Sequence, residues 1–290
     1  MYERRYGLIR TLAPLHVGAS AGEEAGNLNL IFRDAFTQTG IIPGSSIRGR
    51  FRAEMRRKDD DAQSLSNQFY GKAGEGPADI QESLIKFEHA SIVWLPVYCP
   101  GQPIVWVSCP RLLKRYAATI GKPELLDKIP DTDTKSYCSP RLKAKTSKDG
   151  RKILFFNLGF MELWELNDLE ALLPENAEKE STTQLVVVAD SDIGMIHDMA
   201  LYRQSRVRLE DNEKVASDGG FFNLEALPEG TLMVFPIAVR PPKASDPEPR
   251  EWKPVDGVEG GNGEMYFGGL ESIGFGRCEI SIHKTTETSK

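Results

Sequence analysis

Cysteine is scarce in this sequence. Only four occur among 290 residues, and none forms a C-x-x-C pair. They are Cys99, Cys109, Cys138 and Cys278. A zinc knuckle needs closely spaced cysteines and a disulfide framework needs more of them, so both are disfavoured. We expect four buried, reduced thiols.

Long apolar runs are also missing. No stretch reaches the roughly 18 apolar residues that a membrane-spanning helix needs, and residues 1–5 lead into an alternating segment rather than an apolar signal core. The 40% of hydrophobic residues is still enough for a sizeable core. The sequence predicts a soluble, cytoplasmic, globular protein with no membrane partner.

Two nucleotide-binding signatures are absent as well. There is no G-x-x-x-x-G-K-[ST] motif, and the GFG of residues 274–276 does not continue into a dinucleotide fingerprint that opens a helix. Nucleoside-triphosphate chemistry is therefore disfavoured.

The chain has no excess of positive charge. It contains 36 Lys and Arg against 42 Asp and Glu, a formal net charge of −6. A uniformly basic coat is excluded, so any site for a polyanion has to be a local concentration of basic residues.

Residues 41–52 provide such a concentration, because a Pro-Gly turn leads directly into a basic helix. Ile47, Phe51 and Met55 recur at a spacing of four and predict its buried face. Ser45 or Ser46 is the expected cap, and the free N–H groups of a helix N-terminus favour anions. The candidate phosphate ligands here are Gly44, Ser45, Ser46, Arg48, Gly49, Arg50 and Arg52, together with Arg33 upstream.

A second candidate lies near the other end of the sequence, in the glycine-rich residues 268–277. Glycines let a backbone approach another chain closely, and their N–H groups can bind phosphate. The candidate residues are Gly268, Gly269, Gly274, Gly276 and Arg277.

A projecting hairpin is predicted between these two stretches, at residues 203–222. Val207 and Leu209 alternate with arginines, and residues 218–220 are typical of a turn. Its first arm carries Arg203, Arg206 and Arg208.

The remaining pattern predicts one domain, residues 1–290, with three polar insertions. The insertions are expected at about residues 63–81, 121–151 and 240–265, the last as a long exposed loop. Strands are predicted at residues 84–98, 103–109, 153–166 and 184–189. One helix is predicted from Pro110, and another after residues 190–192, with Asp190, Ser191 or Asp192 as its cap.

Few residues are candidates for acid–base chemistry. His16 follows the first predicted strand, and we expect a hydrogen-bonded structural imidazole rather than a catalyst. Arg33 and Asp34 can pair with each other or with RNA, and an exposed pair contributes only about 0–1 kcal/mol to stability.

In this order, four stretches resemble the RAMP superfamily of CRISPR RNA-binding proteins: residues 33–52, residues 94–113, the arginine hairpin that closes at residues 227–228, and residues 268–277. The resemblance is most specific to the backbone subunit of type III-B effector complexes, with the type III-A counterpart as second choice. It implies an α+β fold, a modified ferredoxin-like (RRM-like) palm with inserted fingers and a thumb at about residues 203–227.

The resemblance also implies partners. Copies of such a subunit stack along a guide CRISPR RNA, with residues 44–52 and the glycine-rich loop on its phosphates and the thumb interrupting the guide–target RNA duplex. The other implied partners are further effector subunits: a large polymerase-like subunit, a small helical subunit and other RAMP subunits. Such phosphate contacts position RNA without reading its sequence.

The sequence departs from the resemblance at the catalytic position. In the family an aspartate upstream of the R-[DE] pair cuts target RNA with a divalent metal, and here that position is Leu28, which can neither ligate a cation nor accept a proton. The acidic-acidic-aromatic element at the end of the thumb appears as Leu224-Glu225-Ala226. We therefore expect a subunit that binds RNA without a cofactor and does not cleave it.

Two alternatives remain open. One is a metal-dependent endoribonuclease, using Mg or Mn, in which Glu23, Glu24 or Asp34 replaces the missing aspartate. The other is a guide-processing ribonuclease that acts alone with His16 as its general acid or base.

Overall fold

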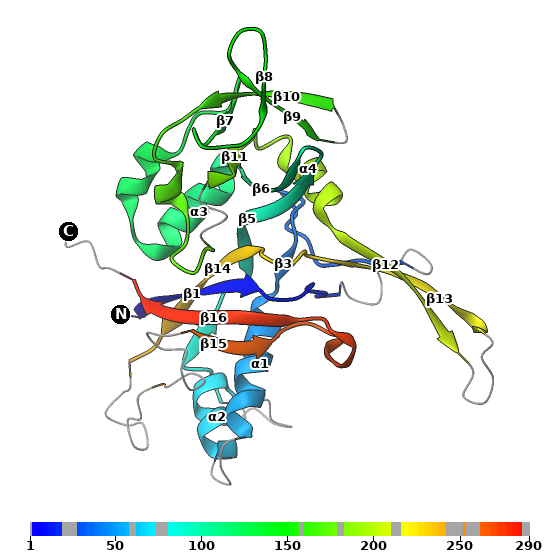
Figure 1. The fold of residues 1–290 in the computed structure, drawn as a ribbon. Helices are drawn as coiled ribbons and strands as arrows, with labels where there is room; N and C mark the ends of the chain where they lie inside the picture. Colours follow the sequence, from blue (N-terminus) through cyan, green and yellow to red (C-terminus); the bar gives the residue numbers. More distant parts are fainter. Residues whose placement is uncertain are drawn as a thin grey trace.

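The computed structural model describes residues 2–18, 28–57, 62–72, 81–156, 159–178, 183–209, 216–241, 252 and 262–285. In these residues one large mixed sheet dominates, helices pack against it, and a hairpin projects from one side (Figure 1). The predicted combination of a sheet-based palm with a projecting thumb is confirmed.

The helices are α1 (Gly44–Arg56), α2 (Ala62–Tyr70), α3 (Pro110–Ile120) and α4 (Ile193–Ala200), with the short 3₁₀ helices η2 (Pro123–Lys128), η3 (Leu169–Leu172) and η5 (Glu271–Ile273). The strands are β1 (Glu3–Thr11), β2 (Leu28–Asn29), β3 (Ile41–Ile42), β4 (Ile85–Phe87), β5 (Ala90–Cys99), β6 (Gln102–Ser108), β7 (Ser136–Cys138), β8 (Lys145–Thr146), β9 (Lys152–Phe156), β10 (Gly159–Glu165), β11 (Leu185–Val187), β12 (Tyr202–Leu209), β13 (Ala216–Ala226), β14 (Leu232–Val239), β15 (Gly263–Tyr266) and β16 (Arg277–Lys284). The main sheet runs β15-β16-β1-β14-β5-β6-β11-β7-β10-β9-β8, with β3 on β5 and β4 on β14.

Strand β5 lies at the centre of this sheet. Every residue of β5 except Tyr98 is buried. Its successive side chains enter two different cores, one on each face of the sheet. Leu95 belongs to the first core, and Trp94 belongs to the second, together with Leu113 and Tyr116 of α3. A strand covered on both faces reads as a continuous apolar run, which explains its sequence.

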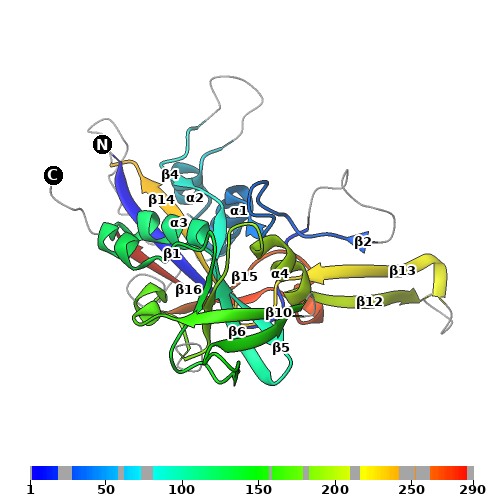
Figure 2. The same cartoon turned by 90° about the horizontal axis from the view of Figure 1, so that it is seen from above.

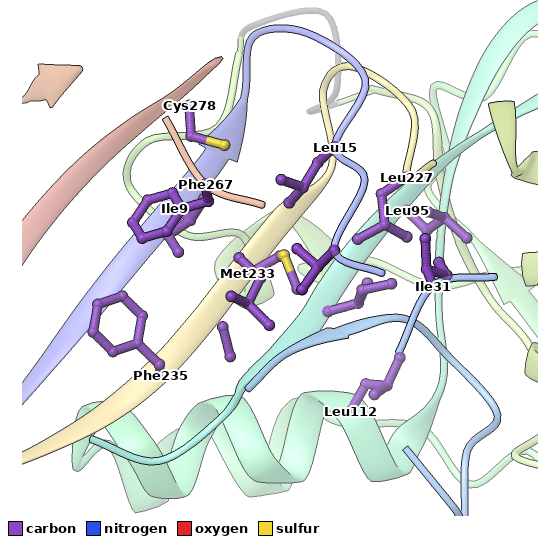
Figure 3. Close-up of a cluster of buried hydrophobic side chains, with 14 of the residues drawn as sticks. Ile9, Leu15, Ile31, Leu95, Leu112, Leu227, Met233, Phe235, Phe267 and Cys278 are labelled. Atoms are coloured by element: carbon purple, nitrogen blue, oxygen red, sulfur yellow. The ribbon is translucent and has the colours of Figure 1, made fainter. Parts of the chain in front are cut away.

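One buried core joins the hairpin root to loops from both ends of the chain. Ile9 of β1, Leu15, Leu227, Met233 of β14 and Phe267 lie together in it (Figure 3). The root of the hairpin, the loop after β1 and the start of the glycine-rich loop are thus held by the same buried cluster.

The predicted polar insertion at residues 121–151 is more integrated than expected. It contains β7, which lies inside the main sheet between β11 and β10. Tyr137 and Cys138 of β7 pair antiparallel with β11. Three residues are too few for an apolar periodicity to stand out, so the strand was hidden in a polar segment.

Of the three residues predicted to cap the helix after residue 189, Asp192 occupies the N-cap position, but its side chain makes no cap hydrogen bond. Asp190 Oδ1 instead accepts the backbone N–H of Arg111, in the first turn of α3, at 2.9 Å. Helix α4 begins after Asp192 without a side-chain cap. Strands β6 and β11 are parallel neighbours, so the residues that follow β11 lie beside the helix that follows β6.

The prediction that residues 240–265 form an exposed loop is wrong at two places that the structure describes. Trp252 is 2% exposed and donates its indole N–H to the Tyr70 hydroxyl at 2.9 Å. Its ring lies near Phe51 of α1 and Phe87 of β4. Strand β15 occupies the end of the same stretch.

The predicted hairpin is confirmed as β12 and β13, which extend away from the body (Figure 2).

Two further features of the described part of the chain bear on the sequence analysis. All four cysteines are buried and free, and no described helix has the length and apolarity that a membrane crossing needs.

Candidate nucleic-acid interface

The glycine-rich loop lies beside the loop after β1 because the two ends of the chain pair in the sheet. Strand β1 pairs antiparallel with β16, with Thr11 opposite Cys278. The loop after β1 and the loop before β16 therefore leave the same end of the sheet. They are joined there by Gly276 N–H to Pro14 O at 2.9 Å and Gly269 N–H to His16 O at 3.0 Å.

Glycine is required at two positions of this second loop. A Cβ on Gly268, where φ is +77°, would lie 2.1 Å from His16 O. A Cβ on Gly276, where φ is +84°, would lie 2.3 Å from Phe267 O. Only glycine combines these dihedral angles with such close backbone approach.

The N-terminus of α1 is uncapped, which corrects the prediction that Ser45 or Ser46 caps it. Pro43 occupies the N-cap position, no side chain caps the helix, and no acid lies in its first turn. Ser46 N–H and Ile47 N–H both donate to Pro43 O. The N–H groups of Gly44 and Ser45 have no partner among the described residues, so they remain available to an anion.

One flank of α1 faces the glycine-rich loop across a cleft of about 420 Å³. We call it the glycine-loop cleft; its α1 side is lined by Ser46, Gly49 and Arg50, and its loop side by Gly268 and Gly269. Five of the predicted phosphate-binding residues, three from α1 and two from the glycine-rich loop, therefore face each other across this cleft. Gly274 lies apart, with nothing within 4 Å of its Cβ position.

Arg50 is partly neutralised in this cleft. It pairs with Glu54 one turn further along α1, and its Nη1 lies 3.7 Å from Glu271 Oε1 of the glycine-rich loop. Its buried Nε has no hydrogen-bond partner among the described residues.

The other flank of α1 lines a separate pocket of about 580 Å³. We call it the arginine pocket; its polar lining includes Gly44, Ser45, Arg48, Arg52, Lys72 and Lys86. Gly44 is required here, because a Cβ would lie 2.4 Å from Phe87 O of β4. The predicted cradle is thus two sites, one on each side of the helix.

Positive charge is uncompensated around Arg52. Burial and then the charges of Arg56 and Arg48 lower the pKa of Arg52. Its described hydrogen-bond partner is the neutral Asn67, and Arg48 is exposed with no carboxylate partner in the described part of the chain. Glu82 also lines the pocket and pairs with Lys86 at 2.6 Å, so the uncompensated charge that favours an anionic ligand is that of Arg48 and Arg52.

Arg33 and Arg203 meet at one buried carboxylate. Arg33 Nη2 donates to Glu225 Oε2 at 3.0 Å, and Arg203 Nη2 donates to Glu225 Oε1 at 3.1 Å. Arg33 also pairs with Asp198 at the end of α4. Burial alone would lower the pKa of Arg33, but the hydrogen bonds to these two carboxylates raise it.

The other basic candidates are Arg206, Arg208 and Arg277, which lie on the thumb and at the end of the glycine-rich loop. The Arg206 guanidinium lies 5.3 Å from the ring centroid of Phe275, so the thumb contacts the glycine-rich loop. Arg277 is half exposed and lies 3.7 Å from Glu264. The side chain of Arg208 lies outside the described part of the structure, although its backbone belongs to β12. RNA contact by these arginines stays a prediction.

The acid–base candidates are structural where the structure describes them. His16 is buried and its Nδ1 donates to Glu225 O at 2.6 Å, which confirms a hydrogen-bonded imidazole. Asp34 Oδ1 accepts the backbone N–H groups of Phe36 and Thr37, both at 2.9 Å, as in an Asx turn. Although burial alone would raise the pKa of Asp34, these hydrogen bonds lower it.

The remaining positions weighed for cleavage are Glu23, Glu24 and Leu28. Glu23 and Glu24 lie outside the described residues, and the side chain of Leu28 is not described. Across the described ranges, no group of three or more His, Cys, Asp or Glu side chains is arranged to hold a metal ion.

Sequence reasoning missed several site residues. Lys72, after α2, and Lys86 of β4 line the arginine pocket beside α1. The sequence shows Glu225 only as part of an altered motif, and its role as the shared partner of two arginines depends on the fold. An isolated acid in an apolar strand, as in Leu224-Glu225-Ala226, is the one signal that pointed to a buried pair.

The fold and these sites define a palm-and-thumb protein that gathers uncapped helix amides and arginines on α1. The glycine-rich loop was predicted to offer its N–H groups to phosphate, but those of Gly269, Gly274 and Gly276 are bonded to backbone carbonyls of the protein. The chain belongs to the RAMP superfamily, whose family model matches residues 8–279. No curated protein sequence matches it.

Solved structures share the fold over nearly the whole chain. A chain of the type III-B Cmr-beta complex bound to cognate target RNA is 21% identical, with a TM-score of 0.71 and 96% of each chain covered. Oligomeric Cmr4 from Pyrococcus furiosus is 17% identical, with a TM-score of 0.66, 99% of this chain and 100% of that chain covered. Pyrococcus furiosus Cmr4 (Cas7) is 15% identical, with a TM-score of 0.60, 97% of this chain and 100% of that chain covered.

Proposed function

We propose that this protein is a guide-RNA-binding backbone subunit of a type III-B CRISPR effector complex. Copies of it line up along the guide, hold its phosphates on both flanks of α1, and support the guide–target RNA duplex. Its partners are the guide RNA, target RNA, further copies of the chain and the other effector subunits. The proposal places it in the cytoplasm, where guide and target RNA meet.

One observation carries this proposal: in a RAMP fold, α1 presents its uncapped N-terminus and two arginines on one flank and faces the glycine-rich loop with the other. The available N–H groups of Gly44 and Ser45 and the uncompensated charge of Arg48 and Arg52 suit the phosphates of a nucleic acid. The solved relatives support the partners, since one is described as bound to target RNA and another as oligomeric.

The test is RNA binding by the purified chain, with single-stranded RNAs of unrelated sequence and a range of salt concentrations. Arg48→Ala is expected to weaken all of them alike and to reduce the slope of log K against log salt by roughly 0.7, the value for one lost phosphate contact. Arg141→Ala removes an exposed arginine of the β7–β8 connection and serves as the matched control. A loss that depends on RNA sequence, or no loss for Arg48→Ala, contradicts the proposal.

RNA binding requires no cofactor in this proposal, and Mg or Mn matters only if cleavage is retained. The absence of an acid at Leu28 and the structural bonds of Asp34 favour a subunit that does not cleave. Incubating the assembled complex with matched target RNA and Mn²⁺ tests this, and the target is expected to stay intact. Regularly spaced fragments that disappear when Glu23, Glu24 or Asp34 is changed to Ala establish the endoribonuclease instead.

A further inference from the structure

The root of the thumb is held to the body on two faces. Strand β13 alternates there, so that Leu224 and Ala226 point to one side and Glu225 to the other. Leu224 and Ala226 are both fully buried and form a small cluster with Phe275 of the glycine-rich loop. This apolar face joins the thumb to the loop that precedes β16.

The opposite face is ionic. Glu225 is 3% exposed, and each of its carboxylate oxygens accepts a hydrogen bond from a different arginine. Arg203 lies opposite Glu225 in the β12–β13 register, so this pair moves with the thumb. Arg33 comes from the palm segment after β2, so this second pair crosses from the palm to the thumb.

Arg33 reaches a third element as well. Its other terminal nitrogen, Nη1, pairs with Asp198 at the end of α4. The guanidinium therefore bridges α4 and the thumb, and both of its charged partners are carboxylates. An RNA phosphate at Arg33 would have to displace one of them, and displacing Glu225 would leave a buried charge with a single partner.

We propose that Arg33 is a positioning residue of the thumb, acting through Glu225 and Asp198, and not a phosphate ligand. This positioning role rests on the proposed function in one respect, namely that the thumb is the element that contacts the RNA. It separates Arg33 from Arg48, although the sequence places both in one basic stretch.

Two measurements on the full-length chain test this assignment. One is the salt dependence of single-stranded RNA binding, which counts phosphate contacts. The other is hydrogen exchange of the amides in residues 202–207 and 221–227, which reports the opening of the thumb root. The variants are Arg33→Ala, Arg33→Lys and, as the matched control, Arg48→Ala.

For Arg33→Ala we expect at least about tenfold faster exchange in the thumb root and an unchanged salt slope, because a pair to a buried carboxylate is lost and no phosphate contact is. For Arg48→Ala we expect the reverse, with unchanged exchange and a slope lower by roughly 0.7. Arg33→Lys keeps one charge and is expected to fall between Arg33→Ala and the unaltered chain in exchange.

The assignment is overturned if Arg33→Ala lowers the salt slope of RNA binding, whatever the hydrogen exchange shows. It is also overturned if Arg33→Ala leaves hydrogen exchange in the thumb root unchanged. If Arg33→Ala does not fold, Arg33→Lys is judged by the same two criteria. If Arg48→Ala leaves RNA binding intact, the proposed function fails, and the exchange result for Arg33 still decides the positioning role.

Discussion

At the scale of single residues, adjacent glycines of the loop before β16 have different tasks. Gly268 is fixed by sterics, since a Cβ there would lie 2.1 Å from His16 O at a φ of +77°. Gly269 has nothing within 4 Å of its Cβ position, although its N–H is bonded to His16 O. Two residues that look alike in the sequence are therefore separable by experiment.

We expect Gly268→Ala to lower the free energy of unfolding by about 1–3 kcal/mol, because it combines a left-handed backbone with a clash against a carbonyl. Gly269→Ala is the matched control and should change stability by less than about 0.5 kcal/mol. Urea unfolding of both variants checks this. Equal losses for the two would contradict the steric argument.

A second residue-scale prediction concerns His197, which is fully buried and accepts the backbone N–H of Gly40 on Nε2 at 2.9 Å. Burial lowers the pKa of His197. The folded protein therefore holds the neutral imidazole, whereas the unfolded chain takes up a proton near its ordinary pKa of about 6.5. This contribution to stability is complete above about pH 6.5 and is lost as the pH falls toward the lowered pKa.

Unfolding free energies measured between about pH 7.5 and about pH 5.5 should therefore decrease on acidification, by up to ~1.4 kcal/mol for each unit by which the pKa is lowered. His197→Gln retains an acceptor for Gly40 N–H but does not titrate, so its decrease should be smaller. The half-buried His89, whose pKa burial also lowers, leaves a residual slope in that variant. If the free energy of unfolding decreases equally with pH in His197→Gln and in the unaltered protein, His197 is excluded as a source of the pH dependence.

At the scale of elements, α1 shows what the sequence can and cannot predict. Its buried face is local, so spacing alone predicts Ile47 and Phe51, which the structure confirms. Its charged face is only partly local. Arg50 pairs with Glu54 one turn along the helix, a spacing that the sequence shows, and also lies 3.7 Å from Glu271, more than two hundred residues away. Composition identifies the arginines, but the fold is needed to show all the carboxylates that neutralise them.

Helix α1 also carries a glycine that the fold itself does not need. Gly49 lies in the helix interior, has nothing within 4 Å of its Cβ position, and lines the glycine-loop cleft. We expect Gly49→Ala to stabilise the protein by about 0.5–1 kcal/mol, because alanine is the better helix former. We also expect several-fold weaker RNA binding, because the added methyl group narrows the cleft.

Thermal unfolding and RNA titration on the same preparation check both halves of this prediction. Higher stability with unchanged RNA affinity would show that RNA does not approach the backbone at Gly49. Lower stability would show that the space around it is not free for a side chain.

Secondary structure was predictable where the elements are long and regular, and less so where they are short. The apolar run of β5 and the alternation of the thumb arms carried their own signals. Strand β7 has only three residues, and Trp252 is a buried anchor in a stretch of polar composition. Both depend on partners far away in the sequence, which periodicity does not reveal.

At the scale of the whole molecule, the two predicted phosphate-binding stretches come from distant parts of the sequence and face each other across the glycine-loop cleft. No local pattern specifies that arrangement, so the sequence suggested it only through its resemblance to RAMP proteins. The fold adds that the thumb root packs against the same glycine-rich loop through Phe275.

This arrangement predicts how the protein assembles on RNA. Phosphate contacts are independent of sequence, so each additional stretch of single strand offers an equivalent site, and bound copies should increase in proportion to RNA length. Native mass spectrometry with two RNAs, one twice as long as the other, should show about twice as many copies on the longer one. Arg48→Ala should reduce occupancy on both lengths, whereas Arg141→Ala should not. A fixed copy number on both RNAs would mean that the chain recognises an end or a folded feature, and the backbone role would then be wrong.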